Sequence, residues 1–351
     1  LVTAEKLLRS RQSNQFPHDG DKFCQTIYHA ALAGAYELTD RVANFALEAS
    51  ARKEVITQES ETEIQFEPVI KRVIHDPVYG TYELELPESS WSLIDDPERN
   101  VDPIMFRNFS REFADYEEEE SLAWPDGPLY KVDPLFRKTC LTTDALLPLI
   151  TTNPSVAREV LLALLIEEPG VRCRELGIAC HREWYPPFYT QGPLLFFIRH
   201  QPTEGLELIL RLVNFATERW ADSWRRENKT IPDVPVILSG SEHRWLGNQQ
   251  VYYWYHNYTS CPYPVTVALM VLEKWLYDEI DENRPINNAI ELILQRSTSV
   301  AFAGLLSAVA RKSPVLFQGC LRSLLTVPEF YLWESPANTV LDCIDFALVR
   351  L

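Results

Sequence analysis

The sequence predicts an all-α fold, an irregular α-solenoid of HEAT-like helix pairs with small β-containing insertions. Two observations predict the helix pairs: apolar residues recur at spacings of three and four, and one helix–proline–helix phrase is repeated along the chain. A third observation, that two stretches lose this periodicity, predicts the insertions. The 351 residues, of which 46% are hydrophobic, suffice for one large or two ordinary domains with a sizeable core.

The repeated phrase is an apolar run, a polar residue, a proline and an apolar residue seven positions later. The proline and the later apolar residue are Pro154 and Leu161, Pro202 and Ile209, and Pro314 and Leu321. The residue before a proline avoids the α region, and proline is well accepted at the first position of a helix. We therefore expect the three apolar residues to be buried at equivalent places in the second helix of each pair. A weaker copy surrounds Pro285.

The N-terminal segment, residues 1–56, is predicted to be helical. Within it, residues 21–52 form one apolar stripe typical of a single long helix, with Asp21 as its cap. The residues of the stripe are Phe23, Ile27, Ala31, Gly34, Leu38, Val42, Phe45 and Ala49. This stripe is expected to face the core.

Residues 57–130 form an acidic, proline-rich linker or insertion that is predicted to be partly β. Tyr82, Leu84 and Leu86 alternate with glutamates, which indicates a strand, and residues 64–74 can pair with it as a hairpin. The four glutamates at 117–120 favour a solvated loop or helix face, because like charges repel. The alternative is a docking strip for a basic partner.

Residues 131–351 are predicted to be the helical-repeat domain, with an aromatic insertion at 227–264. Residues 234–238 read as a strand, and residues 245–258 are dense in Trp and Tyr. If residues 251–255 are also a strand, Tyr252 and Trp254 share one face, and the opposite face packs against a helix over 265–280. The aromatic residues are then either core or a binding surface, and we predict that Tyr252 and Trp254 bind a partner. Trp184 and Tyr185, in a proline-containing loop, are predicted partner-binding residues for the same reason.

The formal net charge of -17 and the pI of about 4.9 argue against nucleic acid and anionic membranes as partners. Seven cysteines without a C-x-x-C pair indicate reduced thiols in a cytoplasm. The first residue is Leu1, and residues 340–351 form an amphipathic helical run without a cap. We therefore expect the chain to be a segment of a longer polypeptide.

Common catalytic and metal-binding motifs are not found in the sequence. No glycine is followed by lysine, so a phosphate-binding P-loop is missing, and the isolated chain is expected not to bind ATP with micromolar affinity. Cys173, Cys180 and His181 lack the spacing of a structural zinc site. The sequence therefore predicts no catalytic residue, no cofactor and no metal.

Residues 74–80 (Ile-His-Asp-Pro-Val-Tyr-Gly) and 94–98 (Ile-Asp-Asp-Pro-Glu) resemble the opening of HD-domain phosphohydrolases. The resemblance implies a metal-dependent hydrolase, which is the alternative function. In that family metal-binding histidines and a His-Asp pair follow on helices, whereas no later His-Asp pair occurs here. His75 and Asp76 precede Pro77, which places them in extended chain.

A broader resemblance covers about residues 120–351. Its phrases are Trp-Pro-Asp-Gly-Pro-Leu-Tyr at 124–130, Val-Asp-Pro-Leu-Phe at 132–136, and the helical runs at 159–168, 212–220 and 299–306. Together they resemble the helical region of large bacterial ATP-binding proteins of the STAND-like P-loop type, several of which are linked to phage defence. The resemblance implies a non-catalytic scaffold or sensor region of a larger cytoplasmic protein, with the nucleotide site elsewhere. Its expected partner is a protein, another domain of the same polypeptide or a second copy of the chain.

Overall fold

The structure, a computed structural model, describes residues 1–12, 21–51, 53–55, 69–76, 80–87, 129–166, 176–178, 184–226, 228–256 and 261–333. Most of these residues are in helices and a few form two-stranded sheets, so the prediction of a mostly α-helical chain with small β elements is confirmed. The chain divides into two compact units. The larger unit consists of residues 1–54 and 130–351, and the smaller of residues 55–129.

The larger unit begins with α1 (Val2–Gln12), α2 (Asp21–Ala33), a 3-10 turn η2 (Gly34–Tyr36) and α3 (Thr39–Ser50). The prediction of one helix over 21–52 is wrong, because Leu38 leaves the helical conformation, with φ -127° and ψ 49°. The break lets α2 and α3 pack together. Tyr28 of α2 and Phe45 of α3 then meet Phe136, with ring centroids 5.6–6.1 Å apart. Phe23 and Leu38, two residues of the stripe predicted to face the core, are 70% and 48% exposed instead.

The next helices are α6 (Pro134–Thr142), the 3-10 turn η3 (Asp144–Leu146), α7 (Leu147–Thr152) and α8 (Pro154–Leu165). Asn153 ends α7 and its side-chain oxygen accepts a hydrogen bond from the Val156 amide, so that it caps α8. Pro154 begins α8, as the repeated phrase predicts. Leu161 is fully buried.

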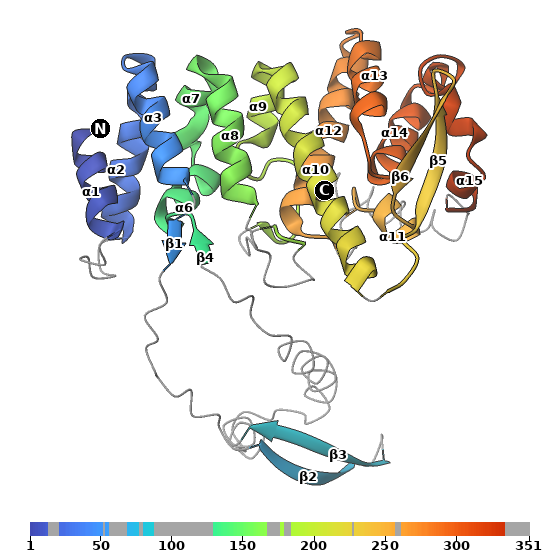
Figure 1. The fold of residues 1–351 in the computed structure, drawn as a ribbon, viewed down its shortest axis with the longest axis horizontal. Helices are drawn as coiled ribbons and strands as arrows, with labels where there is room; N and C mark the ends of the chain where they lie inside the picture. Colours follow the sequence, from blue (N-terminus) through green and yellow to red (C-terminus); the bar gives the residue numbers. More distant parts are fainter. Residues whose placement is uncertain are drawn as a thin grey trace. The chain divides into compact units, whose positions relative to one another are not determined.

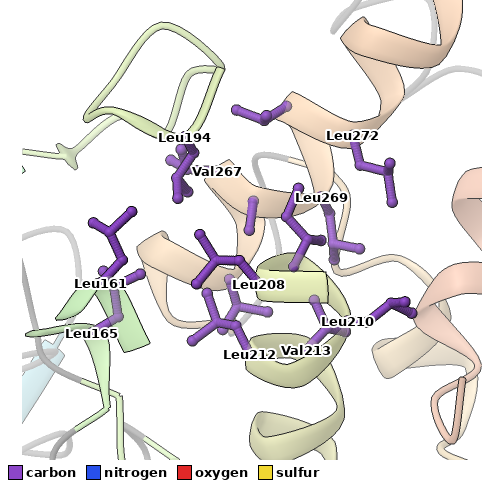
Figure 2. Packing of buried hydrophobic residues seen from close by; sticks show 14 of the residues in the cluster. Leu161, Leu165, Leu194, Leu208, Leu210, Leu212, Val213, Val267, Leu269 and Leu272 are labelled. Atoms are coloured by element: carbon purple, nitrogen blue, oxygen red, sulfur yellow. The ribbon is translucent and has the colours of Figure 1, made fainter. Parts of the chain in front are cut away.

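The second pair has the same form, with α9 (Leu194–His200) followed by the long α10 (Pro202–Arg226). Ile209 is buried, as predicted. Figure 2 shows leucines of α8, α9 and α10 packing together with Val267, Leu269 and Leu272 of α12 (Tyr263–Asp281). These apolar contacts join successive helix pairs into one core.

Between α10 and α12 lies the aromatic insertion. The predicted strand at 234–238 is confirmed as β5 (Asp233–Leu238), which forms an antiparallel hairpin with β6 (Ser241–Leu246). After β6 the chain forms the short helix α11 (Gln249–Tyr252), so the predicted strand at 251–255 is wrong. The reason is local: the Asn248 side chain accepts a hydrogen bond from the Val251 amide and starts a helix.

After α12 come α13 (Asn287–Arg296), α14 (Ala301–Lys312), the 3-10 turns η6 (Pro314–Gln318) and η7 (Arg322–Thr326), and α15 (Pro328–Trp333). Leu321 is buried, as predicted, but it lies between two 3-10 turns and not in an α-helix. Gly319, with φ -113° and ψ -120°, ends η6 before an α-helix can form. The third copy therefore keeps the buried position and loses the second helix.

Neighbouring helices of the larger unit contact one another in chain order, through α2 and α6, α3 and α8, α8 and α10, α10 and α12, and α12 and α14. Figure 1 shows this succession from α1 to α15. None of the helices in the described ranges has an apolar stretch long enough to cross a lipid bilayer.

In the smaller unit, β2 (Val69–Asp76) and β3 (Gly80–Pro87) form an antiparallel hairpin in which Ile74 is opposite Tyr82. The predicted hairpin is thus confirmed. At the two places where the chain passes from one unit to the other, the short strands β1 (Lys53–Val55) and β4 (Leu129–Lys131) pair with each other. The glutamates at 117–120, the phrase at 94–98, Cys173, Cys180, His181 and residues 340–351 lie outside the described residues.

Candidate interaction surface

Tyr252 and Trp254, two of the predicted partner-binding residues, are 0% and 1% exposed. The prediction that they form a partner surface is therefore wrong. The Tyr252 ring packs against Phe330 and Trp333 of α15, with centroids 5.5 and 5.3 Å away. These two tyrosine-ring contacts belong to the hydrophobic core.

Close packing against α14 explains why this segment is buried. A Cβ atom placed on Gly304 of α14 would lie 2.2 Å from the Tyr252 carbonyl oxygen and 2.8 Å from the Tyr255 ring. Only glycine permits this approach. The Tyr253 hydroxyl donates to the Trp333 carbonyl oxygen, so this ring also has a fixed place. The sequence could not reveal these contacts, because α14 and α15 lie about fifty to eighty residues further along the chain.

The loop at 184–193, the other predicted site, is held in a defined conformation. Trp184 is 2% exposed and anchors its start. The Gln191 side chain closes it, since its Nε2 donates to the Pro186 carbonyl and its Oε1 accepts from the Phe188 amide, both at 2.8 Å. Gly192, with φ +66°, lies so close to the Trp184 ring that a Cβ atom there would be 2.4 Å away. Trp184 is thus the anchor of the loop and not a partner contact.

Tyr185 differs from Trp184 because 67% of it is exposed. Its ring lies 5.4 Å from that of Tyr263, the first residue of α12. Further along the loop, Tyr189 packs on Phe188 at 4.3 Å and lies 5.8 Å from the Lys274 ammonium. Tyr189 and Tyr263 are half-buried and pack against the hydrophobic core, so Tyr185 is the exposed member of the group. We call Tyr185, Tyr189 and Tyr263 the tyrosine surface. The loop motif indicated Tyr185, but Tyr263 is 78 positions away and no sequence signal joins the two.

Further along α12, next to the Lys274 that contacts Tyr189, the Asp278 carboxylate joins two helices. It accepts hydrogen bonds from Lys274 of α12 and, at 2.6 Å, from Arg199 of α9. Burial alone would raise the pKa of Asp278, but the two cations bring this pKa below its usual value. The carboxylate is therefore ionised at neutral pH and forms an ion pair with both bases.

A second network of ion pairs lies on α8, α10 and α13. Arg158 pairs with Glu204, Arg211 pairs with Glu159 at 2.6 Å, and Arg296 pairs with Glu207. Burial would raise the pKa of Glu159, yet hydrogen bonds from Arg211 and Arg158 lower it. The basic side chains of this network are thus neutralised within the unit.

The potential metal-ligating side chains are dispersed over the described part of the chain. The described residues contain no group of three or more His, Cys, Asp or Glu side chains that could hold a metal ion. Burial raises the pKa of the Cys140 and Cys261 thiols, which disfavours the nucleophilic thiolate. His75 and Asp76 lie on β2 opposite Thr81 and Gly80, so the prediction that they are in extended chain is confirmed.

Comparison with known proteins assigns this chain to no family. No family model matches the chain, and no curated protein matches it.

Proposed function

We propose that this chain is a non-catalytic helical-repeat scaffold or sensor region of a larger cytoplasmic ATP-binding protein, and that its tyrosine surface binds a protein partner. The observation that carries the proposal is the fixed loop at 184–193. It buries Trp184 and leaves Tyr185 67% exposed against Tyr263. Tyrosine is enriched among residues that dominate binding energy, and a rigid loop loses little entropy when it binds.

The scaffold part of the proposal rests on the helix pairs. Both α8 and α10 begin with proline directly after a shorter helix, and successive helices contact one another in chain order. We interpret this arrangement as an irregular α-solenoid with HEAT-like pairs. Arrays of this kind offer extended surfaces, and each pair needs its neighbours to bury its apolar side. The partner is another domain of the same polypeptide, a second copy or a separate protein.

The ATP-binding part rests on the resemblance of the helical phrases and assigns the nucleotide site to a part of the polypeptide outside these residues. Calorimetry with the isolated chain should then detect no micromolar ATP binding. A micromolar dissociation constant would overturn this part of the proposal and leave the tyrosine surface to be judged separately.

Photo-cross-linking tests the surface directly. A photoreactive phenylalanine analogue would replace Tyr185 in the full-length polypeptide within its host. The matched control is Tyr36, a tyrosine of η2 that is 63% exposed. We expect a discrete cross-linked protein from position 185 and none from position 36.

Direct binding must then confirm the cross-link. With the cross-linked protein purified, Tyr185→Ala combined with Tyr263→Ala should weaken binding about tenfold or more, as removal of an interface hot spot does. Tyr36→Ala should leave binding unchanged. Equal cross-linking from positions 185 and 36, or unchanged binding by the double variant, would overturn the proposal.

A further inference from the structure

We infer that Asp278 is the positioning residue of the tyrosine surface, holding the loop at 184–193 and α9 in place through Lys274 and Arg199. The consequence for binding rests on the proposed function, but the positioning itself does not. The Asp278 side chain is only 19% exposed. Its Oδ1 accepts from Lys274 and its Oδ2 from Arg199, so each carboxylate oxygen has its own cation.

Lys274 connects Asp278 to the loop, because it contacts both. Its ammonium group pairs with Asp278 and lies 5.8 Å from the centroid of the Tyr189 ring. A cation over an aromatic face is attracted by the ring, and the attraction grows when the cation is partly shielded from water. Lys274 is 33% exposed. The carboxylate thus fixes the cation, and the cation fixes Tyr189.

Arg199 connects Asp278 to α9, the helix that follows the loop. The loop ends at Pro193 and α9 begins at Leu194, so a shift of α9 moves the end of the loop. Arg199 lies in the last turn of α9 and reaches Asp278 across 79 positions of sequence. Asp278 therefore holds the loop at two points, within it at Tyr189 and beyond it in α9.

Replacing the carboxylate by a neutral amide leaves Lys274 and Arg199 as neighbouring positive charges without their shared counterion. Two like charges at this separation repel, and more strongly near a protein surface than in bulk water. Lys274 then turns to solvent and Tyr189 loses its cation. The other end of the loop stays anchored by the buried Trp184, so the change is confined to the loop and does not unfold the unit.

The same helix provides a matched control. Asp281 of α12 pairs with Lys312 of α14, and the Lys312 ammonium lies 4.8 Å from the Tyr277 ring. This arrangement repeats the acid, lysine and tyrosine of the Asp278 site, but it lacks the loop. Asp281 is more exposed than Asp278, at 62% against 19%, and has one cation instead of two. Asp281→Asn therefore removes an acid–lysine pair beside a tyrosine on the same helix without touching the residues that hold the tyrosine surface.

Hydrogen–deuterium exchange on the purified chain tests the inference without any partner. In Asp278→Asn, the amides at 188–192, the stretch between the prolines of the loop, should exchange about tenfold faster, because hydrogen bonds to charged groups typically contribute the free energy of such a change. Asp281→Asn should leave this stretch unchanged, and the conservative Asp278→Glu should restore slow exchange. Thermal unfolding of each variant shows that the fold is retained.

Unchanged exchange in Asp278→Asn, or equal acceleration in Asp281→Asn, would overturn the positioning role. A failure of Asp278→Glu to restore slow exchange would do the same, since a carboxylate is what the inference requires. The proposed function fails by a different result, the absence of a specific cross-link from position 185. The two failures are therefore distinguishable.

Discussion

The two units of the chain differ sharply in charge. Residues 55–129 contain 19 acidic and 5 basic residues, whereas the rest of the chain contains 31 acidic and 28 basic residues. Most of the net charge of -17 thus belongs to the smaller unit, and the larger unit is close to neutral. An average over the whole chain conceals this division.

The division changes how the acidity is interpreted. The negative net charge argues against nucleic acid and anionic membranes as partners mainly for residues 55–129, which carry most of that charge. For the larger unit the relevant observation is the pairing of its bases: Arg158, Arg199, Arg211 and Arg296 each form an ion pair with a carboxylate from another helix. The larger unit uses its charges to join helices.

The largest expected effect is the loss of apolar packing in the larger unit. Leu161→Ala and Ile209→Ala should each lower the free energy of unfolding by ~2–5 kcal/mol, because truncating a buried Leu or Ile leaves a cavity. Leu332→Ala is the control, since Leu332 is 72% exposed. Urea denaturation measures all three. Equal small losses would show that the helix pairs do not share one core.

A smaller loss is expected where α14 approaches α11. Gly304→Ala places a methyl group against the Tyr252 carbonyl oxygen and should cost about 1–3 kcal/mol, as overpacking does. Gly34→Ala is the control, because the nearest atom to its added Cβ would be Val42 Cγ2 at 3.8 Å. Thermal denaturation compares the two. If both variants melted alike, α14 and α11 would not be as closely packed as the structure has them.

The sequence predicted where most helices and strands lie better than it predicted which of their side chains are exposed. Proline placement located the starts of α8 and α10, and alternation located the β2–β3 hairpin, because both signals are local. The break between α2 and α3 was missed, since it depends on Tyr28 and Phe45 meeting Phe136 far along the chain. Spacing alone also could not distinguish a strand at 251–255 from the short helix that Asn248 caps.

The candidate site shows the same limit. Four aromatic residues were predicted to bind a partner, and only Tyr185 is exposed. Large aromatic side chains are typical of binding surfaces and of hydrophobic cores, so residue type alone cannot distinguish the two. The structure buries three of the four, namely Tyr252, Trp254 and Trp184. Tyr263, Lys274 and Asp278 lie near the loop only through the packing of α9 on α12, a contact between distant segments.

Removing the smaller unit sharpens the comparison between the units. Its ends lie together, since β1 pairs with β4, so residues 58–127 can be replaced by a short Gly-Ser linker. We expect a folded, nearly neutral chain whose melting temperature differs from that of the parent by less than about 4 °C, the shift that ~1 kcal/mol produces in larger domains. Circular dichroism measures this change. A molten or aggregated product would show that the larger unit depends on residues 55–129.

The smallest expected effect is the pH dependence of one ion pair in the larger unit. The pKa of Asp278 lies below its ordinary value because Lys274 and Arg199 bind the ionised form. A carboxylate with a lowered pKa stabilises the folded state above its unfolded-state pKa, and this stabilisation is lost as the pH falls through the folded-state pKa. Wild type should therefore exceed Asp278→Asn in unfolding free energy at pH 7 by up to about 1 kcal/mol, the usual scale of such pairs. The difference should remain at pH 5 and diminish as the pH is lowered to 2, as wild-type Asp278 takes up its proton. Urea denaturation at the three pH values measures it. A difference that stayed constant across this range would mean that the amide alters packing and that the charge on Asp278 contributes nothing.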